Sequence, residues 1–109
     1  MYLTKGMFQE NLNTRFWLTA EGAEPYALDL VEFVEFHSAP KQEQFSLRFR
    51  GDRGQIFPQL IYAMKHEAMG EFELFLVPVG RDDGGTFYEA VFNRLIDQEP
   101  EKTVQQKAS

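Results

Sequence analysis

The sequence predicts a small, soluble, mainly β domain, and three observations support this prediction. At 109 residues the chain has the usual length of one domain, with no room for a second core. Several segments alternate apolar and polar residues with a period of two, as half-buried strands do. The strongest local signal is a predicted hairpin from Phe72 to Phe92, around which the rest of the predicted fold is arranged.

The composition is sufficient for a packed core and excludes several kinds of chemistry. Aromatic residues make up 15% of the chain, so a core can form without a disulfide or a metal. The absence of cysteine excludes disulfides, cysteine-ligated zinc, iron–sulfur clusters and thiol nucleophiles. The formal net charge of -6 disfavours binding to nucleic acid and to anionic membrane surfaces.

The N-terminal segment predicts a short helix over residues 4–12 that closes an end or an edge of the β structure. Thr4 is a suitable N-cap, and apolar residues including Met7 and Phe8 follow at helical spacing. Asn13 suits the C-terminal end of this helix because asparagine tolerates left-handed backbone. The segment lacks the apolar stretch of a signal peptide. We therefore expect a cytoplasmic protein, or one exported as part of an assembly without a cleaved signal.

The next part of the chain predicts three strands, of which the second is irregular. The predicted strands cover residues 14–19, 26–37 and 45–50. In the second strand Glu32 falls on the phase that Leu28 and Leu30 keep, which indicates a β-bulge. A helix is the competing interpretation because acidic residues recur there at a spacing of three, but the Val and Phe content favours a strand.

The remaining strands follow an irregular connector that we expect to lie across the core. The connector is 55–59, the fourth strand 60–67, and the hairpin strands 72–79 and 86–95 with a loop at 80–85. Residues 72–79 are apolar on both faces, as in a strand covered on both sides. Pro78 has no N–H to donate, so this end of the strand is an edge or a bulge.

Six short strands in one core predict a small barrel or a two-sheet antiparallel sandwich, and the pattern leaves both open. The predicted β domain, with its helix, covers residues 1–96. Residues 97–109 are polar apart from one isolated valine, which is typical of a disordered tail.

The titratable residues do not form a recognisable catalytic or metal site. His37 and His66 could bind a metal only if the fold brought them together, and we expect partly exposed side chains at strand ends instead. Glu71, Glu73 and Glu89 could do acid–base work across the hairpin, although cross-strand pairing with an arginine is the favoured interpretation. No nucleophile motif or phosphate loop occurs. The sequence therefore predicts no enzyme, and no catalytic, cofactor-binding or metal-binding residue.

A basic group and an apolar segment are the candidate partner-binding features. Three arginines close together oppose the acidic charge of the whole chain. They either contact an acidic partner or pair with neighbouring acids, among them Asp29, Glu32 and Glu35. The apolar segment is the first strand of the hairpin. The candidate residues are Arg48, Arg50, Arg53, Phe75, Val77 and Pro78.

Three stretches resemble a family of small bacterial all-β domains that has no assigned function. They read FSLRFRG at 45–51, FELFLVPVG at 72–80 and YEAVFNR at 88–94, and the resemblance extends over most of the chain. The resemblance implies an association with phage-tail-collar-type fibre proteins and no catalytic residues. The chain departs from the family pattern at Leu60, where a glycine is usual.

We therefore expect a non-enzymatic protein-interaction or structural module, as an accessory subunit of a fibre or phage-tail-like assembly. Its partner would be a second copy or a fibre-type protein. The alternative is a small-ligand-binding barrel with an interior lined by Phe and Tyr. A third and weaker hypothesis is an enzyme that uses Glu73 or Glu89 with His66.

Overall fold

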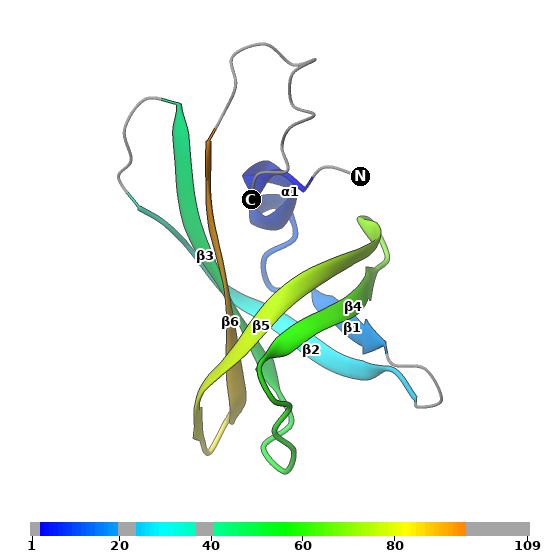
Figure 1. Cartoon of the computed structure of the whole chain (residues 1–109). Helices are drawn as coiled ribbons and strands as arrows, with labels where there is room; N and C mark the ends of the chain where they lie inside the picture. The colour runs from blue at the N-terminus through cyan, green and yellow to red at the C-terminus, as the bar shows by residue number, and fades with distance from the viewer. Residues whose placement is uncertain (1–2, 20–23, 37–40, 96–109) are drawn as a thin grey trace.

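Six antiparallel strands form a closed barrel with a short helix in one end (Figure 1). The structure is a computed structural model, and it describes residues 3–19, 24–36 and 41–95. The elements are α1 (Lys5–Glu10), β1 (Arg15–Thr19), β2 (Tyr26–Glu35), β3 (Gln42–Gly51), β4 (Leu60–His66), β5 (Gly70–Asp82) and β6 (Gly85–Leu95). The predicted mainly β fold with an N-terminal helix is confirmed, and of the two architectures it is the barrel. The predicted tail and His37 lie outside the described residues.

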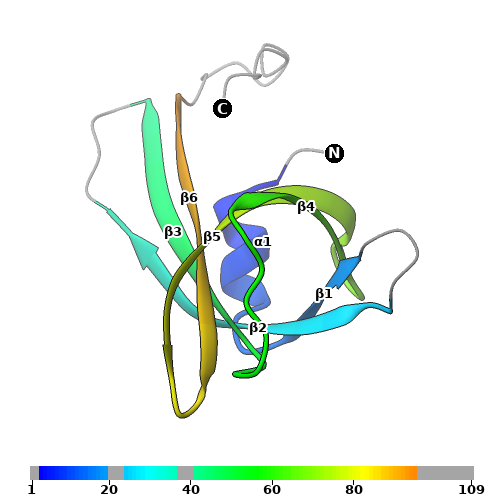
Figure 2. The ribbon, with the colours of Figure 1, turned by 60° about the horizontal axis from the view of Figure 1, so that its bottom comes forward.

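The strand order around the barrel is β1-β2-β3-β6-β5-β4, and pairing of β4 with β1 closes it. In two strands, β2 and β5, the first half pairs with one neighbour and the second half pairs with another. β2 pairs first with β1 and then with β3, while β5 pairs first with β4 and then with β6. The barrel therefore has two walls, which we call the β2–β3–β6 wall and the β1–β4–β5 wall. They diverge towards the end that holds α1 (Figures 1 and 2).

Inward-facing residues of every strand fill the barrel. The alternation that predicted the strands is the alternation that buries them, because successive side chains point to opposite faces of a strand. The buried apolar residues of the strands are Phe16, Leu18, Leu28, Leu30, Phe45, Leu47, Phe49, Met64, Leu74, Leu76, Tyr88 and Ala90. Met69, which lies between β4 and β5, also belongs to this core.

Helix α1 fits between the two walls and fills the barrel's wider end. Thr4 caps it through a capping box with Met7, so the first turn is fixed at its start. The Phe8 ring is fully buried. Its centroid lies between 5.6 and 6.5 Å from four other rings, those of Phe16, Phe45, Phe72 and Phe92. The predicted helix that closes an open end is confirmed, although it is shorter than 4–12.

Two predicted irregularities lie where the sequence indicated them. The β2–β3 register shifts between Leu30 and Glu32, and the β5–β6 register shifts between Pro78 and Gly80. Both are the bulges expected from the phase slip and from the proline.

The predicted loop over 80–85 is wrong, because β5 and β6 continue to a two-residue turn. Asp82 pairs with Gly85, and the Gly84 N–H donates to Asp82 Oδ1 at 2.7 Å. Gly85 has a φ of +149°, and a Cβ there would lie 2.3 Å from the Gly51 carbonyl oxygen. A glycine is therefore required at position 85, the first residue of β6.

The connector between β3 and β4 crosses the other end of the barrel, as predicted (Figure 1). The Phe57 N–H donates to the Tyr88 hydroxyl at 3.0 Å, and this hydroxyl donates to the Gln55 carbonyl at 3.3 Å. The Phe57 ring meets the Tyr26 ring edge-on at 4.7 Å. One tyrosine hydroxyl thus fixes irregular backbone over the core and satisfies both of its own bonding roles.

Candidate protein-interaction surface

The outer face of the β2–β3–β6 wall carries charge pairs between β3 and β2. Arg48 lies opposite Glu32 with a nitrogen–oxygen distance of 3.6 Å, and Arg50 lies 3.7 Å from Asp29. Arg15 also contacts Asp29, through two hydrogen bonds of 2.9 and 3.3 Å. The Arg15 hydrogen bonds are the main reason that the pKa of Asp29 lies below its usual value. The candidate arginines of β3 therefore pair with neighbouring acids, the second of the two interpretations left open by the sequence.

Arg53 belongs to a different contact from the other two arginines. Its Nε donates to the Asp82 carbonyl at 3.2 Å, and its own carbonyl accepts from Arg81 Nη1 at 3.0 Å. These bonds join the connector to the end of the β5–β6 hairpin. The three arginines therefore do not share one set of partners.

The outer face of the β1–β4–β5 wall carries exposed apolar side chains. Ile61 of β4 and Phe75 of β5 are direct cross-strand partners, and they are 64% and 49% exposed. Leu60 is also exposed, but it pairs with buried Leu76 and so points to the opposite face of the sheet. We call Ile61 and Phe75 the β4–β5 apolar patch. The prediction that residues 72–79 are covered on both faces is wrong, because this face of β5 is open among the described residues.

The other two candidate residues of β5 are half-buried. Val77 pairs with Glu89 and Pro78 pairs with Tyr88, so β6 lies beside both. Phe75 lies before the point where β6 begins to pair with β5, which explains its greater exposure.

Acidic residues border the β4–β5 apolar patch on the same face. Along β5 the outward residues before Phe75 are Glu73 and Glu71, which lie opposite Ala63 and Lys65 of β4. A shallow surface depression lies beside the patch, lined on its outer side by Thr19, Ala63, Lys65, Glu71 and Glu73. Since one lysine faces two glutamates, this border has a net negative charge.

His66 lies inside the barrel wall and is only 5% exposed, which corrects the expectation of a partly exposed side chain. Its Nδ1 accepts from the N–H groups of Ala68 and Met69 at 3.0 and 3.2 Å. Nε2 therefore carries the proton and donates to Thr14 Oγ1 at 2.8 Å. Burial lowers the pKa of His66. Its bonds hold the β4–β5 turn against the start of β1.

The acidic residues of the hairpin are not gathered with this histidine. Glu71 and Glu73 are exposed on the outer face of β5, whereas His66 points to the inner face. Within residues 3–19, 24–36 and 41–95, no three histidine or carboxylate side chains lie together as metal ligands would. The same residues contain no helix that is long and apolar enough to span a membrane.

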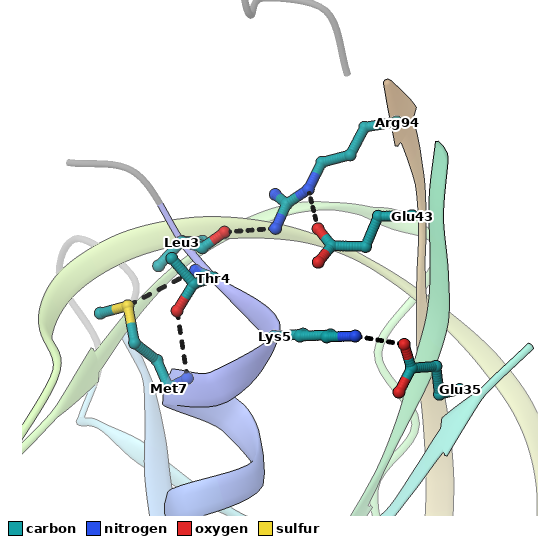
Figure 3. Close-up of polar contacts among 7 residues, drawn as sticks. All are labelled: Leu3, Thr4, Lys5, Met7, Glu35, Glu43 and Arg94. Atoms are coloured by element: carbon teal, nitrogen blue, oxygen red, sulfur yellow. Dashed lines mark hydrogen bonds and ion pairs between the residues drawn. The ribbon is translucent and has the colours of Figure 1, made fainter. Parts of the chain in front are cut away.

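A buried ion pair on the inner side of β6 was missed by the sequence reasoning (Figure 3). Arg94 Nε donates to Glu43 Oε1 at 2.9 Å, and Arg94 Nη2 donates to the Leu3 carbonyl at 2.6 Å. The guanidinium also lies over the Phe92 ring at 5.1 Å. The sequence favoured cross-strand pairing of a hairpin glutamate with an arginine, whereas the structure pairs Arg94 with Glu43 of β3. Alternation along β6 places Arg94 on the buried face and could have indicated this pair.

A family model described as Domain of unknown function (DUF6916) matches residues 3–92, from the segment before α1 to Phe92. The chain belongs to this family. No curated protein and no solved structure matches the chain. The DUF6916 match covers α1, the first five strands and β6 as far as Phe92. The helix inside the barrel is therefore part of the family's domain.

Proposed function

We propose that this domain is a non-enzymatic protein-interaction module that binds its partner through the β4–β5 apolar patch. The observation that supports the proposal is the direct pairing of exposed Ile61 with exposed Phe75. Exposed apolar side chains gathered on a regular element mark binding surfaces more often than scattered ones do. An aromatic residue at the centre of such a patch is a suitable binding hot spot.

The border of the patch defines the chemistry of the partner. Glu71 and Glu73 favour a partner whose apolar contact is flanked by lysine or arginine. Because the whole chain has a net charge of -6, a basic partner surface also gains from long-range attraction. The resemblance to fibre-associated domains makes a subunit of a fibre or phage-tail-like assembly the partner that we propose.

The alternative of a small-ligand barrel receives less support from the packing. The interior positions of the described strands are occupied by aromatic and aliphatic side chains, with Phe8 of α1 added at one end. Phe57 and Tyr88 pack at the opposite end. The aromatic content that suggested a lined cavity serves instead to fill the core.

The test is binding to a phage-tail-collar-type fibre protein, measured by co-elution and by titration calorimetry. Ile61→Ser and Phe75→Ser should each weaken binding at least about tenfold, because each removes a central apolar contact. Val34→Ser is the matched control, since Val34 is an exposed apolar residue on the other wall. Binding that Phe75→Ser leaves unchanged, or no binding to the fibre-type protein, would contradict the proposal.

A further inference from the structure

The second half of β6 is an open sheet edge. β6 pairs with β3 as far as Leu95, opposite Gln42, but its pairing with β5 ends at Glu89, opposite Val77. Both views show β5 turning away from β6 beyond this point (Figures 1 and 2). In the described part of the chain, residues 90–95 therefore have one neighbouring strand.

The hydrogen-bonding direction of each β6 residue follows from one bond in the adjacent strand. The Phe36 N–H donates to the Gln44 carbonyl at 2.9 Å, so the peptide groups of Gln44 face β2. Since the direction alternates along a strand, Phe45 faces β6, and its partner Phe92 faces β3. The residues whose N–H and C=O groups point to the open side are Val91, Asn93 and Leu95.

This edge lacks the features that usually prevent strand pairing. Natural edges are protected by charged side chains, prolines or bulges. Val91 and Leu95 are 64% and 76% exposed, and Asn93 between them is exposed and uncharged. The one charged residue of the segment, Arg94, points to the inner side and pairs with Glu43.

We propose that two copies of this chain pair through β6, antiparallel and with Asn93 at the two-fold axis. In this register Val91 lies opposite Leu95 of the second copy, and the Asn93 residues of the two copies lie opposite one another. The outward pattern of apolar, amide and apolar side chains reads the same in both directions, so the edge is complementary to itself. On the inner side Phe92 lies opposite Arg94 of the second copy, which brings an aromatic ring towards a cation.

For self-association, charge repulsion is weaker at the β6 edge than at the β4–β5 apolar patch. Pairing about Asn93 opposes no two like charges over residues 91–95. Two copies meeting at the β4–β5 apolar patch would instead bring together Glu71 and Glu73 of both chains. The inference goes beyond the proposed function because it uses the other wall of the barrel.

The first test measures the mass of the full chain by sedimentation velocity as protein concentration increases. We expect a species of about twice the 12.7 kDa monomer mass. Asn93→Lys and Asn93→Asp should each be monomeric, because each places two like charges opposite one another at the axis. An equimolar mixture of the two variants should restore the dimer.

The second test is amide hydrogen exchange, which reports the pairing directly. The Val91 and Asn93 amides should be protected in the dimer and should exchange rapidly in Asn93→Lys. The Phe92 amide, which faces β3, should be protected in both proteins and shows that the variant remains folded. Val91→Pro should also weaken the dimer. The proline removes an N–H that points to the open side, and it leaves the hydrogen bonds between β6 and β3 intact.

Phe75→Ser separates this inference from the proposed function, since it should lose the fibre-type partner and remain dimeric. A wild-type chain that stays monomeric at the highest concentration would overturn the inference. It would also be overturned by Asn93 variants that remain dimeric, or by a mixture of the two charged variants that remains monomeric.

Discussion

The two walls of the barrel have the same interior and different exteriors. Both direct aromatic and aliphatic residues inward by simple alternation. Outside, each outward arginine of β3 faces a carboxylate of β2, whereas Ile61 on the other wall faces Phe75. We therefore expect stability to depend on the inner faces, and we propose that recognition depends on the outer face of the β1–β4–β5 wall.

The charge pairs of the β2–β3–β6 wall illustrate how little an outer face contributes to stability. Exposed ion pairs contribute about 0–1 kcal/mol each. Their effect is to neutralise the arginines locally, so that the wall presents little net charge. The β4–β5 apolar patch has no comparable internal partner among the described residues, and this difference can be tested by four substitutions.

Phe8→Ala should have the largest effect, because Phe8 contacts the inner faces of both walls. We expect the free energy of unfolding to fall by about 3–5 kcal/mol, as for other buried phenylalanines. Urea unfolding followed by circular dichroism measures it. Gln9→Ala, on the exposed side of the same helix, is the control and should change little. Equal effects would mean that α1 does not hold the walls together.

Arg94→Met should have the next largest effect, because it leaves the buried Glu43 carboxylate without this guanidinium. Breaking a buried pair in this way costs about 3 kcal/mol. Arg48→Met removes an exposed arginine from the outer face of the same wall and should cost less than about 1 kcal/mol. A similar loss in both variants would contradict the contrast between inner and outer faces.

Acid should weaken the inner face of the other wall through His66. Because the pKa of His66 is lowered in the folded chain, the unfolded chain takes up this proton first as the pH falls. The free energy of unfolding should then decrease as the pH falls below the ordinary histidine pKa of 6.5, by at most about 1.4 kcal/mol per pH unit. His66→Asn keeps an acceptor for the turn amides and does not titrate. Its unfolding free energy should depend less on pH, and an unchanged dependence would assign the effect to other groups.

Phe75→Ser should have the smallest effect on stability. The side chain lies on the outer face, so we expect a change below about 1 kcal/mol, mostly from lost strand propensity. Thermal unfolding compared with Phe49→Ser, which alters a fully buried ring of β3, sets the scale. A large loss in Phe75→Ser would show that the patch belongs to the core.

The sequence predicted what depends on local pattern. Alternation located five of the strands and a continuous apolar run located β5, although β5 extends beyond the predicted 72–79. The phase slip at Glu32 and the missing N–H of Pro78 located both bulges. Closure into a barrel could not be predicted, because it depends on the pairings of β1 with β4 and of β3 with β6, which join strands far apart in the sequence.

The candidate surface was predicted only in part. Alternation placed Phe75 and Val77 on one face, but it could not show that this face is the outer one. Ile61 was not singled out, since its place beside Phe75 depends on the register with β5. The burial of His66 was missed for a similar reason, because its partner Thr14 is distant in the sequence.

The position of α1 has a consequence for the order of folding. Its segment leaves the ribosome before the six strands, yet the rings that bury Phe8 come from strands that extend to Phe92. A helix of six residues is not stable alone in water, so it must remain unformed until the barrel surrounds it. We therefore expect the first element of the chain to be the last to become ordered, in a domain whose non-local pairings already make folding slow.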